Sequence, residues 1–527
     1  MTFQSWGDVT CIRENARRDS LALNVITGSV HISHSLSSAL LPPGARLLGN
    51  MKEYDVVVVG SGSAMNIVEP LIEENPKIRV AVIDKDEPGG ICLTRGCIPS
   101  KILLYPAEVL RTIEEAGRFG ISVEVKGVDF QAVMGRMRRL IDADIDSIRR
   151  GLSESDNIDY YHAEAEFVAP YTMKVEGETI KGRMFLLGAG STAVIPKVEG
   201  LEGAGYLTSD TVLRLTELPE SIAVIGGGYI AAEYGHFFAS MGSRVTVIGR
   251  NPQFLPGEEP EVSALARREL GKRVTIVTNH EVTEVRKGGG SGKVVISKDR
   301  TGGSIVQVEA SEVLVAAGRG PTTALMHPER AGIKTDERGW LAVDDYLQTS
   351  QPNIWALGDA TGRYLFKHKA NYDSQVVYYN AVLKQRVAAD YHAVPHAVFT
   401  DPEVAAVGMG EKEALRARGA EKVMVGFYRY EDTAKGEAMD VRDYFVKIIV
   451  DGETSQILGA HVIGPHASVL VQEIVAAMYT ETRSLSSIYQ AMHIHPALSE
   501  VVERAAGSLV PVEHYHHMLR DYGLEGP

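Results

Sequence analysis

Two cysteines five positions apart carry the clearest chemical signal in the chain. Cys92 and Cys97 lie in the run Gly89–Lys101, and the 527 residues contain three cysteines in all. Residues five apart on a regular α-helix have Cα atoms about 8.6 Å apart, whereas a disulfide needs a Cα separation below about 7 Å. If the two cysteines pair, the backbone between them therefore departs from a regular helix, and Gly96 supplies the necessary freedom.

The residues around the cysteines favour a redox role over a packing role. A disulfide that closes a tight, distorted loop is open to attack and easily cycled. The alternative, two unrelated buried cysteines, leaves the flanking Gly-Gly and Pro-Ser-Lys residues without an explanation. We also expect Pro99 to disrupt the regular hydrogen-bond pattern just after the pair. The run therefore predicts thiol–disulfide chemistry.

A dinucleotide-binding pattern precedes the cysteines. Tyr54–Val59 is a short β-branched run, as in a buried parallel strand, and it leads into Gly60-Ser61-Gly62. Two such glycines let the backbone approach a pyrophosphate at a helix N-terminus. Met65 stands where a third glycine is usual, which leaves close helix–strand packing open. Asp84 ends the next apolar run, where a carboxylate can bind ribose hydroxyl groups.

A second pattern of the same kind makes an internal repeat. Ser221–Ile225 leads into Gly226-Gly227-Gly228, and Ala231 is the small third residue of the turn. The next strand ends at Gly249-Arg250, without the acid that would accept from the 2′-hydroxyl of NADH. Arg250 can instead pair with the 2′-phosphate of NADPH. The alternative is an ordinary surface arginine, so the sequence favours NADPH and leaves NADH open.

These motifs together resemble a known family. The pattern GGxCxxxxCxPSK in Gly89–Lys101 resembles the redox centre of the FAD-dependent pyridine nucleotide-disulfide oxidoreductases. Further turns of that family are matched at Met184–Ser191, Val313–Arg319 and Asn353–Asp359, and the resemblance covers about residues 51–510. It implies an α/β fold with two Rossmann-like dinucleotide-binding domains, for FAD and NAD(P), and a C-terminal α+β dimerisation domain.

The resemblance also implies roles for the catalytic side chains. Cys92 would be the interchange thiol that attacks substrate, and Cys97 the thiolate beside the flavin. Lys101 would pair with Glu233 next to the flavin. A histidine with a carboxylate five residues later, as in His495 and Glu500, can be held in one tautomer and raised in pKa for acid–base work. Taken alone, the sequence around His495 favours a structural histidine; in the family this histidine enters the partner subunit's active site.

The cofactors implied are FAD and either NADPH or NADH. Tyr229 matches the residue that gates the nicotinamide pocket in this family. No metal ligands are predicted. The residues implied for FAD are Gly60, Gly62, Asp84, Gly90, Lys101, Gly190, Ser191, Asp359, Phe366 and His368, and those implied for NAD(P) are Gly226, Gly228, Tyr229, Ala231, Arg250, Gly318 and Arg319.

The pattern along the chain predicts four segments after an unusual beginning. Residues 1–50 lack a clear period and the features of a signal peptide, so we expect a disordered arm or an over-extended reading frame before Met51. We then expect an FAD-binding domain over 51–200, an NAD(P)-binding domain over 201–325, a second part of the FAD domain over 326–393 and an interface domain over 394–527.

Composition restricts the partners. The net charge of −14 argues against nucleic acid or an anionic membrane as a main partner. No apolar run approaches the ~20 residues of a membrane span. A lone Cys-x4-Cys pair in a large α/β chain is typical of intracellular redox chemistry. We therefore expect a cytoplasmic homodimer that acts on a small disulfide or dithiol, with a lipoyl-bearing protein as a further partner.

The substrate stays open between related activities. The redox centre and the His-x-His-Pro stretch favour a dihydrolipoyl dehydrogenase-like enzyme. Arg250, Lys367 and the Pro496-Ala497 pair favour a reductase of mycothione or glutathione type that uses NADPH. A third hypothesis is a diaphorase-like flavoprotein without disulfide turnover.

Overall fold

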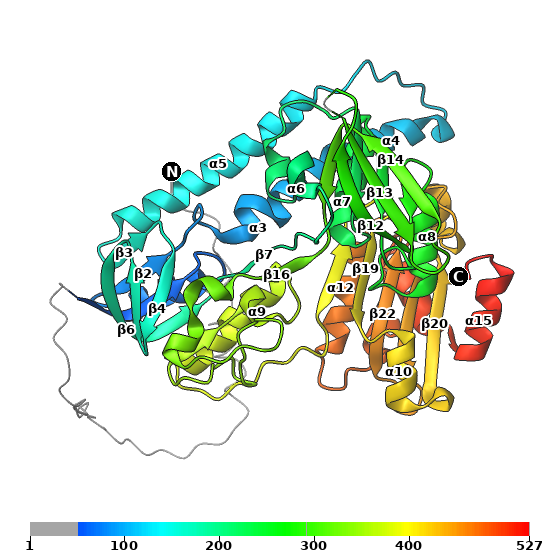
Figure 1. Ribbon diagram of the computed structural model, residues 1–527. Helices are drawn as coiled ribbons and strands as arrows, with labels where there is room; N and C mark the ends of the chain where they lie inside the picture. Colours follow the sequence, from blue (N-terminus) through cyan, green and yellow to red (C-terminus); the bar gives the residue numbers. More distant parts are fainter. Residues whose placement is uncertain (1–50, 291, 526–527) are drawn as a thin grey trace, which may run out of the picture. The chain divides into compact units, whose positions relative to one another are not determined.

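The structure is a computed structural model, and it describes residues 51–290 and 292–525. The prediction for residues 1–50 falls outside the described part of the chain. Within that part, no helix is both long and apolar enough to cross a membrane. The described residues form three large sheets with their covering helices, coloured from blue to red along the chain in Figure 1.

The first sheet is built around the strand that precedes the first glycine turn. β1 (Lys52–Val59) lies between β2 (Val80–Ile83) and β6 (Glu178–Leu187), and all three run parallel. Val56 and Val58 pack on the side of α2, whereas Val57 packs in the opposite core. Burial on both faces explains the continuous β-branched run. The sheet is completed by β3 (Ile158–Tyr161), β17 (Ile354–Ala356) and the antiparallel strands β4 (Ala165–Ala169) and β5 (Thr172–Val175).

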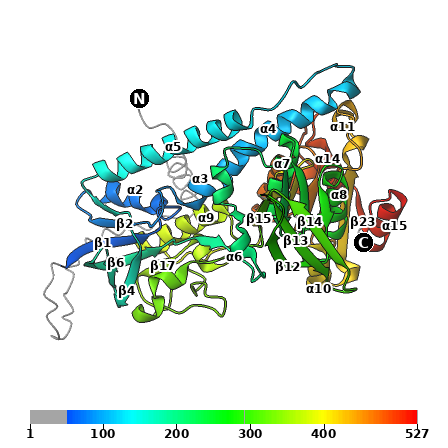
Figure 2. The same ribbon diagram turned by 45° about the horizontal axis from the view of Figure 1, so that its top comes forward.

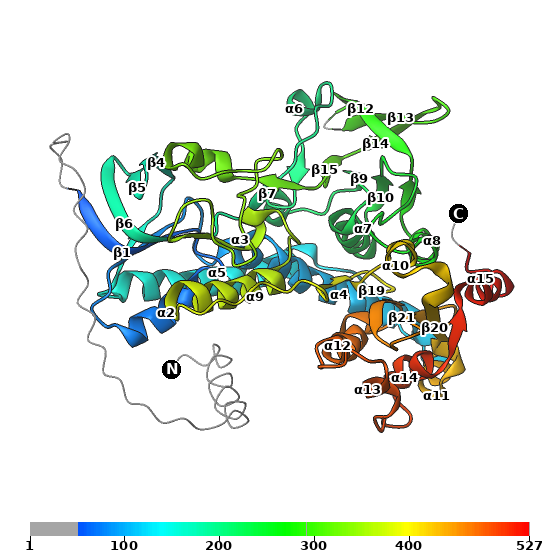
Figure 3. The same cartoon turned by 90° about the horizontal axis from the view of Figure 1, so that it is seen from below.

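Three helices cover this sheet. α2 (Met65–Glu74) and α9 (Lys367–Val377) lie side by side, as Figure 3 shows, although some 300 residues separate them in the sequence. The long α5 (Phe130–Glu154) packs beside α4 (Cys97–Glu115) in Figure 2. Ile67 and Val68 of α2 are buried against the sheet, so Met65 in place of the third glycine does not prevent close packing.

The second sheet repeats the parallel arrangement. Its order is β11 (Thr275–Val277), β10 (Arg244–Ile248), β9 (Ser221–Ile225), β15 (Glu312–Val315) and β8 (Leu207–Thr208). The helices α7 (Tyr229–Met241) and α8 (Pro260–Leu270) accompany it, together with the short α6 (Leu201–Ala204). An antiparallel meander of β12 (His280–Lys287), β13 (Lys293–Asp299) and β14 (Ile305–Ala310) adjoins it, and β7 (Ser191–Ala193) pairs with β16 (Arg319–Pro321).

The two glycine turns are structural equivalents. Gly60 and Gly226 both have positive φ, 94° and 142°. A Cβ on Gly60 would lie 2.2 Å from the carbonyl oxygen of Gly188, and one on Gly226 would lie 2.1 Å from that of Ala316. Each turn therefore packs its backbone against the residue that follows the neighbouring parallel strand, which explains why both positions are glycine. The internal repeat seen in the sequence is a repeat in space.

The third sheet is antiparallel and forms the C-terminal part. Its order is β18 (Pro395–Val398), β19 (Val404–Gly408), β22 (Ile457–Ile463), β21 (Phe445–Asp451), β20 (Val423–Arg429) and β23 (Leu509–Pro511). The accompanying helices are α10 (Glu411–Arg418), α11 (Ala434–Ala438), α12 (Ala467–Met478), α13 (Ser486–Tyr489), α14 (Glu500–Gly507) and α15 (Val512–Asp521). A mostly parallel sheet with two antiparallel strands, a parallel sheet and an antiparallel sheet confirm the predicted α/β fold class, whereas the exact segment boundaries stay predictions.

The cysteine run is a helix broken at a glycine. α3 (Gly90–Arg95) ends at Gly96, and α4 begins directly at Cys97. A Cβ on Gly96 would lie 2.8 Å from the backbone oxygen of Ile91, so a larger residue would not fit there. The expectation for Pro99 needs correction: it lies in the first turn of α4, where its missing N–H costs nothing, and the helix continues through it.

Candidate functional site

The cysteine pair opens into a deep cleft that also receives the first glycine turn. Among the described residues, the predicted site residues that line it are Gly60, Gly62, Asp84, Gly90, Cys92, Cys97, Lys101, Gly190, Tyr229, Glu233, Arg319 and Asp359. They come from the first sheet, from α3 and α4, and from the N-terminal end of α7. The fold thus collects into one cavity side chains that are far apart in sequence.

The two cysteines are adjacent free thiols in this structure. A hydrogen bond from Cys92 lowers the pKa of Cys97 to about 7; burial opposes the change and the nearby Lys101 assists it. The same hydrogen bond, together with burial, raises the pKa of Cys92 well above its usual value. Near neutral pH one proton of the pair therefore stays on Cys92, and Cys97 is the cysteine that ionises to a thiolate.

Lys101 and Glu233 form an ion pair beside Cys97. Nζ of Lys101 donates to Oε1 and Oε2 of Glu233 at 2.9 and 2.8 Å. The backbone N–H of Phe399 also donates to Oε1 of Glu233, at 3.1 Å, and the Lys101 ammonium lies 4.7 Å from the Phe399 ring centroid. The Glu233 carboxylate is buried and fully partnered, so its charge is held in one place.

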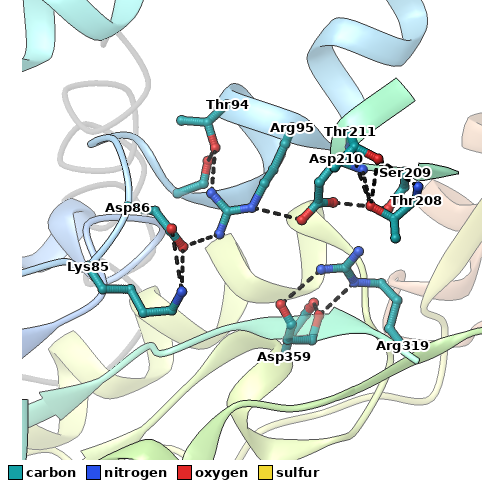
Figure 4. Close-up of polar contacts among 12 residues, drawn as sticks. Lys85, Asp86, Thr94, Arg95, Thr208, Ser209, Asp210, Thr211, Arg319 and Asp359 are labelled. Atoms are coloured by element: carbon teal, nitrogen blue, oxygen red, sulfur yellow. Dashed lines mark hydrogen bonds and ion pairs between the residues drawn. The ribbon is translucent and has the colours of Figure 1, made fainter. Parts of the chain in front are cut away.

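Arg95 anchors the segment between the two cysteines. Its Nη2 contacts Oδ2 of Asp86 at 2.5 Å, and its Nε lies 3.3 Å from Oδ2 of Asp210, as Figure 4 shows. Asp86 follows β2 in the first sheet, whereas Asp210 follows β8 of the second. One guanidinium thus joins the redox segment to both dinucleotide units. Sequence reasoning missed Arg95 because its partners only become neighbours in the folded chain.

The first glycine turn is bonded to the predicted ribose acid. The backbone N–H and the hydroxyl group of Ser61 donate to Oδ2 of Asp84 at 2.8 and 2.6 Å. The Ser61 hydroxyl also accepts from the backbone N–H of Gly89 at 3.0 Å. Ser61 therefore connects the turn, the end of β2 and the start of the cysteine run.

A second acid enters the cleft from the other direction. Oδ2 of Asp359 accepts from the hydroxyl group of Ser191 at 2.5 Å, and Arg319 donates from Nε to that same hydroxyl oxygen at 2.7 Å. Asp373 fixes the turn before Asp359, because it accepts from the backbone N–H of Gly358 at 2.8 Å. Ser191 is buried and connects Asp359 with Arg319, both of which line the cleft.

Lys367 is a cation in the cleft that the predicted site did not include. Its Nζ donates to the Ser63 hydroxyl group at 2.8 Å, at the start of the helix after the glycine turn. Burial lowers the pKa of Lys367, and attraction to Cys92 and Cys97 opposes that effect. The sequence signal was present, since Lys367 lies between the two predicted residues Phe366 and His368.

Aromatic side chains gather at the Tyr229 end of the cleft. The Phe366 ring stacks on His368, with centroids 5.3 Å apart, and lies 6.5 Å from the Tyr229 ring. Nε2 of His368 contacts the carbonyl oxygen of Pro395 at 2.7 Å. Burial raises the pKa of Tyr229 to about 12, so its phenol stays neutral at physiological pH.

His495 lies outside the cleft of its own chain. Its side chain is 70% exposed, and its Nδ1 lies 3.0 Å from Oε1 of the buried Glu500. The hydrogen bond with His495 is the main reason why the pKa of Glu500 lies below its usual value. The other oxygen of Glu500 accepts from the backbone N–H of Ala497 at 3.2 Å. The ring is therefore oriented by a fixed carboxylate while most of its surface is exposed.

The second glycine turn lies apart from the cleft. Gly226 and Gly228 precede α7, Ala231 is buried in that helix, and Arg250 is exposed just after β10. Gly318 precedes β16, which carries Arg319 toward the first site. The structure therefore separates the predicted NAD(P) residues into an outer set at the end of the second sheet and an inner set, Tyr229 and Arg319, in the cleft.

One carboxylate cluster with metal-like spacing occurs within the described residues. Glu259, Glu261 and Glu411 are buried with their oxygens close together. Nζ of Lys447, which is completely buried, contacts them at 2.5, 2.7 and 2.8 Å, and Tyr515 donates to Glu261 at 2.6 Å. The ammonium group supplies the cation here, and the cluster joins the second parallel sheet region to the antiparallel sheet.

The cleft fits an extended dinucleotide with a flavin at the cysteine end. The backbones of Gly62 and Gly90 are in close contact there: a Cβ on Gly90 would lie 2.6 Å from the Cα of Gly62. The carboxylates of Asp84 and Asp359 lie along the cleft wall and can accept from sugar hydroxyl groups. Cys97 and Lys101 line the same cavity, so the residues present fit FAD.

Comparisons with known proteins agree with this arrangement. The family model described as pyridine nucleotide-disulphide oxidoreductase matches residues 54–382, and the model of that family's dimerisation domain matches 394–506. The chain belongs to the pyridine nucleotide-disulphide oxidoreductase family. It is an oxidoreductase that acts on disulfides with FAD and NAD(P)H as cofactors, and its dimerisation domain supports a homodimer, as the sequence predicted.

Relatives with different substrates are about equally similar. Mycothione reductase of Mycobacterium tuberculosis is 34% identical over 466 residues, covering 86% of this chain and 99% of that protein. Dihydrolipoyl dehydrogenase of Chlamydia pneumoniae is 33% identical over 476 residues, covering 88% and 98%. The solved structure of the HOCl-induced flavoprotein disulfide reductase RclA from Escherichia coli has a TM-score of 0.76 and 28% identity, covering 86% of this chain and 99% of that chain.

Proposed function

We propose that Cys92 and Cys97 reduce a low-molecular-mass disulfide, with electrons that come from NADPH. The observation that carries the proposal is the adjacency of the two thiols at the inner end of the FAD-compatible cleft. FAD, when bound, supplies two-electron transfer between the reduced nicotinamide and the cysteine disulfide. Cytoplasmic location belongs to the same proposal, because a thiol pair of this kind works in a reducing compartment.

The cysteine pair would reduce the substrate disulfide in two thiol–disulfide exchange steps. Cys92 attacks one sulfur of the substrate disulfide, which forms a mixed disulfide and releases the first substrate half as a thiol. Cys97 then attacks the sulfur of Cys92, which forms the Cys92–Cys97 disulfide and releases the second half. The substrate gains two electrons and two protons, and the cysteine pair loses them.

Proton transfer at Cys92 needs a base, because its hydrogen bond to Cys97 and its burial raise the pKa of its thiol. We assign that role to His495 of the partner subunit. The ring is fixed by Glu500 and exposed on the surface of its own chain, as a group that serves a second chain must be. Lys101 acts as a positioning charge that favours the Cys97 thiolate, and Glu233 holds it there.

NADPH is favoured over NADH by the end of β10. Gly249 and Arg250 provide no carboxylate for a 2′-hydroxyl, and the exposed Arg250 guanidinium can donate hydrogen bonds to a 2′-phosphate. Tyr229 lies at the cleft end nearest the second unit and would cover the nicotinamide pocket.

A second candidate is oxidation of a dihydrolipoyl group, either free or on a lipoyl-bearing protein. The similarity to dihydrolipoyl dehydrogenase, as extensive as that to mycothione reductase, supports it. Low-mass disulfide reduction is preferred because Lys367 adds a cationic group to the cleft that a neutral lipoamide substrate does not require.

The proposal is tested by steady-state assays of the FAD-loaded dimer. NADPH and NADH are each tested with mycothione, glutathione disulfide and lipoamide, and NAD⁺ with dihydrolipoamide. We expect the highest kcat/KM for NADPH with a low-mass disulfide. A higher value for NAD⁺ with dihydrolipoamide would favour the second candidate. Turnover with quinone acceptors alone would leave only a diaphorase.

A further inference from the structure

A second arginine lies against the residue that we assign to the 2′-phosphate. Arg300 is in the turn between β13 and β14, 50 positions after Arg250. Its Nη1 donates to the backbone carbonyl oxygen of Arg250 at 3.2 Å. The Arg300 side chain is 47% exposed, so its remaining N–H groups are accessible to a ligand.

This contact lies at the ligand-binding edge of the second sheet. The strands β9, β10 and β11 are parallel, so their carboxyl ends meet at one edge, where doubly wound folds bind nucleotides. The backbone N–H of Gly226 donates to Ile248 at 2.9 Å, and that of Gly249 donates to Val277 at 2.8 Å. A Cβ on Gly249 would lie 3.2 Å from the Cα of Gly227, so the end of β10 packs on the glycine turn itself.

The turn that carries Arg300 is fixed against this edge by backbone hydrogen bonds. The N–H of Arg300 donates to Asn279 at 2.9 Å, and the N–H of Asn279 donates to Asn251 at 2.8 Å. Within the turn, Oδ1 of Asp299 accepts from the backbone N–H groups of Gly302 at 2.5 Å and of Thr301 at 2.7 Å. Arg300 is therefore presented by an ordered turn and is not a freely placed surface side chain.

The charged groups at the edge are two arginines and two carboxylates. The carboxylate that approaches the Arg300 guanidinium is that of Glu281, whose Oε2 lies 4.0 Å from Nε. The Asp299 carboxylate is already occupied by its own turn, and these hydrogen bonds, from Gly302 first, lower its pKa to about 2. Positions 249 and 250 carry no acid. Arg300 and the exposed Arg250 thus place two guanidinium groups at this edge, where Asp299 is ionised but held by its own turn and Glu281 lies 4.0 Å from Arg300.

We propose that Arg300 and Arg250 together bind the 2′-phosphate of NADPH, which makes Arg300 a specificity-determining residue supplied by the antiparallel meander. A phosphate group has several oxygens and can accept from both guanidinium groups at once. A 2′-hydroxyl has one oxygen, which is uncharged and a weaker acceptor. The inference rests on the proposed NADPH preference. It adds a second guanidinium group to the exposed Arg250, which would otherwise bind the phosphate alone.

The test measures binding to the FAD-loaded dimer by calorimetry. The probes are adenosine 2′,5′-bisphosphate, which carries the extra phosphate, and 5′-AMP, which lacks it. For Arg300→Gln we expect the Kd of the bisphosphate to rise about ten- to a hundredfold, with an unchanged Kd for 5′-AMP. The KM for NADPH should rise in parallel while that for NADH stays constant. Arg300→Lys, which keeps the charge, should recover part of the affinity.

Arg286→Gln is the matched control. It is an exposed arginine on β12 of the same meander, near the opposite end from the Arg300 turn, and its loss should leave both Kd values unchanged. If Arg250→Gln weakens bisphosphate binding but Arg300→Gln does not, this inference is overturned and the NADPH preference stands. If wild-type protein binds the two probes equally, the NADPH preference itself fails, and this inference with it.

Discussion

The ammonium group of Lys101 and the carboxylate of Glu233 face each other across two helices that belong to different dinucleotide units, with both N–O distances below 3 Å. The two charges act on Cys97 in opposite directions, because Lys101 lowers the pKa of the thiol and Glu233 raises it. The pair therefore tunes the thiolate while it joins α4 to α7.

Substitution of either partner should shift the pKa of Cys97 with opposite sign. We expect Lys101→Met to raise it and Glu233→Gln to lower it, each by about one unit, or 1.4 kcal/mol. The measurement is the rate of iodoacetamide alkylation of Cys97 in reduced protein across pH 5–10, read from its peptide by mass spectrometry. Lys126→Met, an exposed lysine between α4 and α5, is the control. Shifts of the same sign in both variants would contradict the account.

Variants of Cys92 separate its two roles. Cys92→Ser should abolish disulfide turnover, retain FAD and quinone reduction, and keep the Cys97 pKa near 7, because a serine hydroxyl still donates to the thiolate. Cys92→Ala removes that donor, and the Cys97 pKa should rise toward about 8.5. The alkylation profile of Cys97 distinguishes the two variants. Faster alkylation of Cys92 in Cys97→Ser than of Cys97 in Cys92→Ser, at pH 7, would reverse the assigned roles.

Arg250→Glu should exchange the coenzyme preference. The new carboxylate repels a 2′-phosphate and can accept from a 2′-hydroxyl. Loss of one charge-assisted contact is worth about 1.5–3 kcal/mol, so the kcat/KM ratio of NADPH to NADH should fall at least tenfold. Steady-state kinetics with a quinone acceptor measure it independently of the disulfide step. An unchanged ratio would make Arg250 a surface base without a role in binding.

His495 should act across the dimer. His495→Gln should reduce disulfide turnover by about 10²–10⁴ and spare quinone reduction, since only the former needs proton transfer at Cys92. Mixed dimers of a Cys92→Ser chain with a His495→Gln chain then have one intact site if the histidine works in trans. Activity near half of the wild-type value is expected, and mixed dimers as inactive as both parents would refute the shared site.

Lys447 should be the most sensitive position outside the cleft. Lys447→Met leaves Glu259, Glu261 and Glu411 buried without a cation and should cost about 3–5 kcal/mol at pH 7.5. In the wild type, burial raises the pKa of Glu261, but Lys447 outweighs burial and keeps that pKa below its normal value. The ionised Glu261 therefore contributes to the free energy of unfolding above pH 4.5, and this contribution is lost as the pH falls. In the variant the three glutamates lack a cation, so its stability should instead rise as the pH falls and they become protonated.

Thermal denaturation of this variant and the wild type at pH 5.5 and 7.5 checks the dependence. The deficit of the variant should shrink at the lower pH, because protonation of the glutamates relieves their repulsion. Lys412→Met, exposed on α10 beside Glu411, controls for the loss of a charge. A deficit that stays constant or grows toward pH 5.5 would contradict the electrostatic origin.

The sequence predicted what local patterns encode. Gly60 and Gly226 could be placed because a strand followed by glycines has few alternative conformations, and the break at Gly96 followed from helix geometry. Contacts between segments that are distant in the sequence could not be predicted from local patterns. Arg95 and Asp210 meet only because the two units dock, and nothing local in the chain marks Lys447 as a buried cation among glutamates.

The central claim is that Cys92 and Cys97 form a redox couple in electronic contact with the flavin. Anaerobic titration of the FAD-loaded enzyme with dithionite counts the electrons directly. The wild type should take up two electrons more per FAD than free flavin does, and Cys92→Ser and Cys97→Ser should each lose this excess. A wild-type protein that accepts only the electrons of its flavin would contradict the claim.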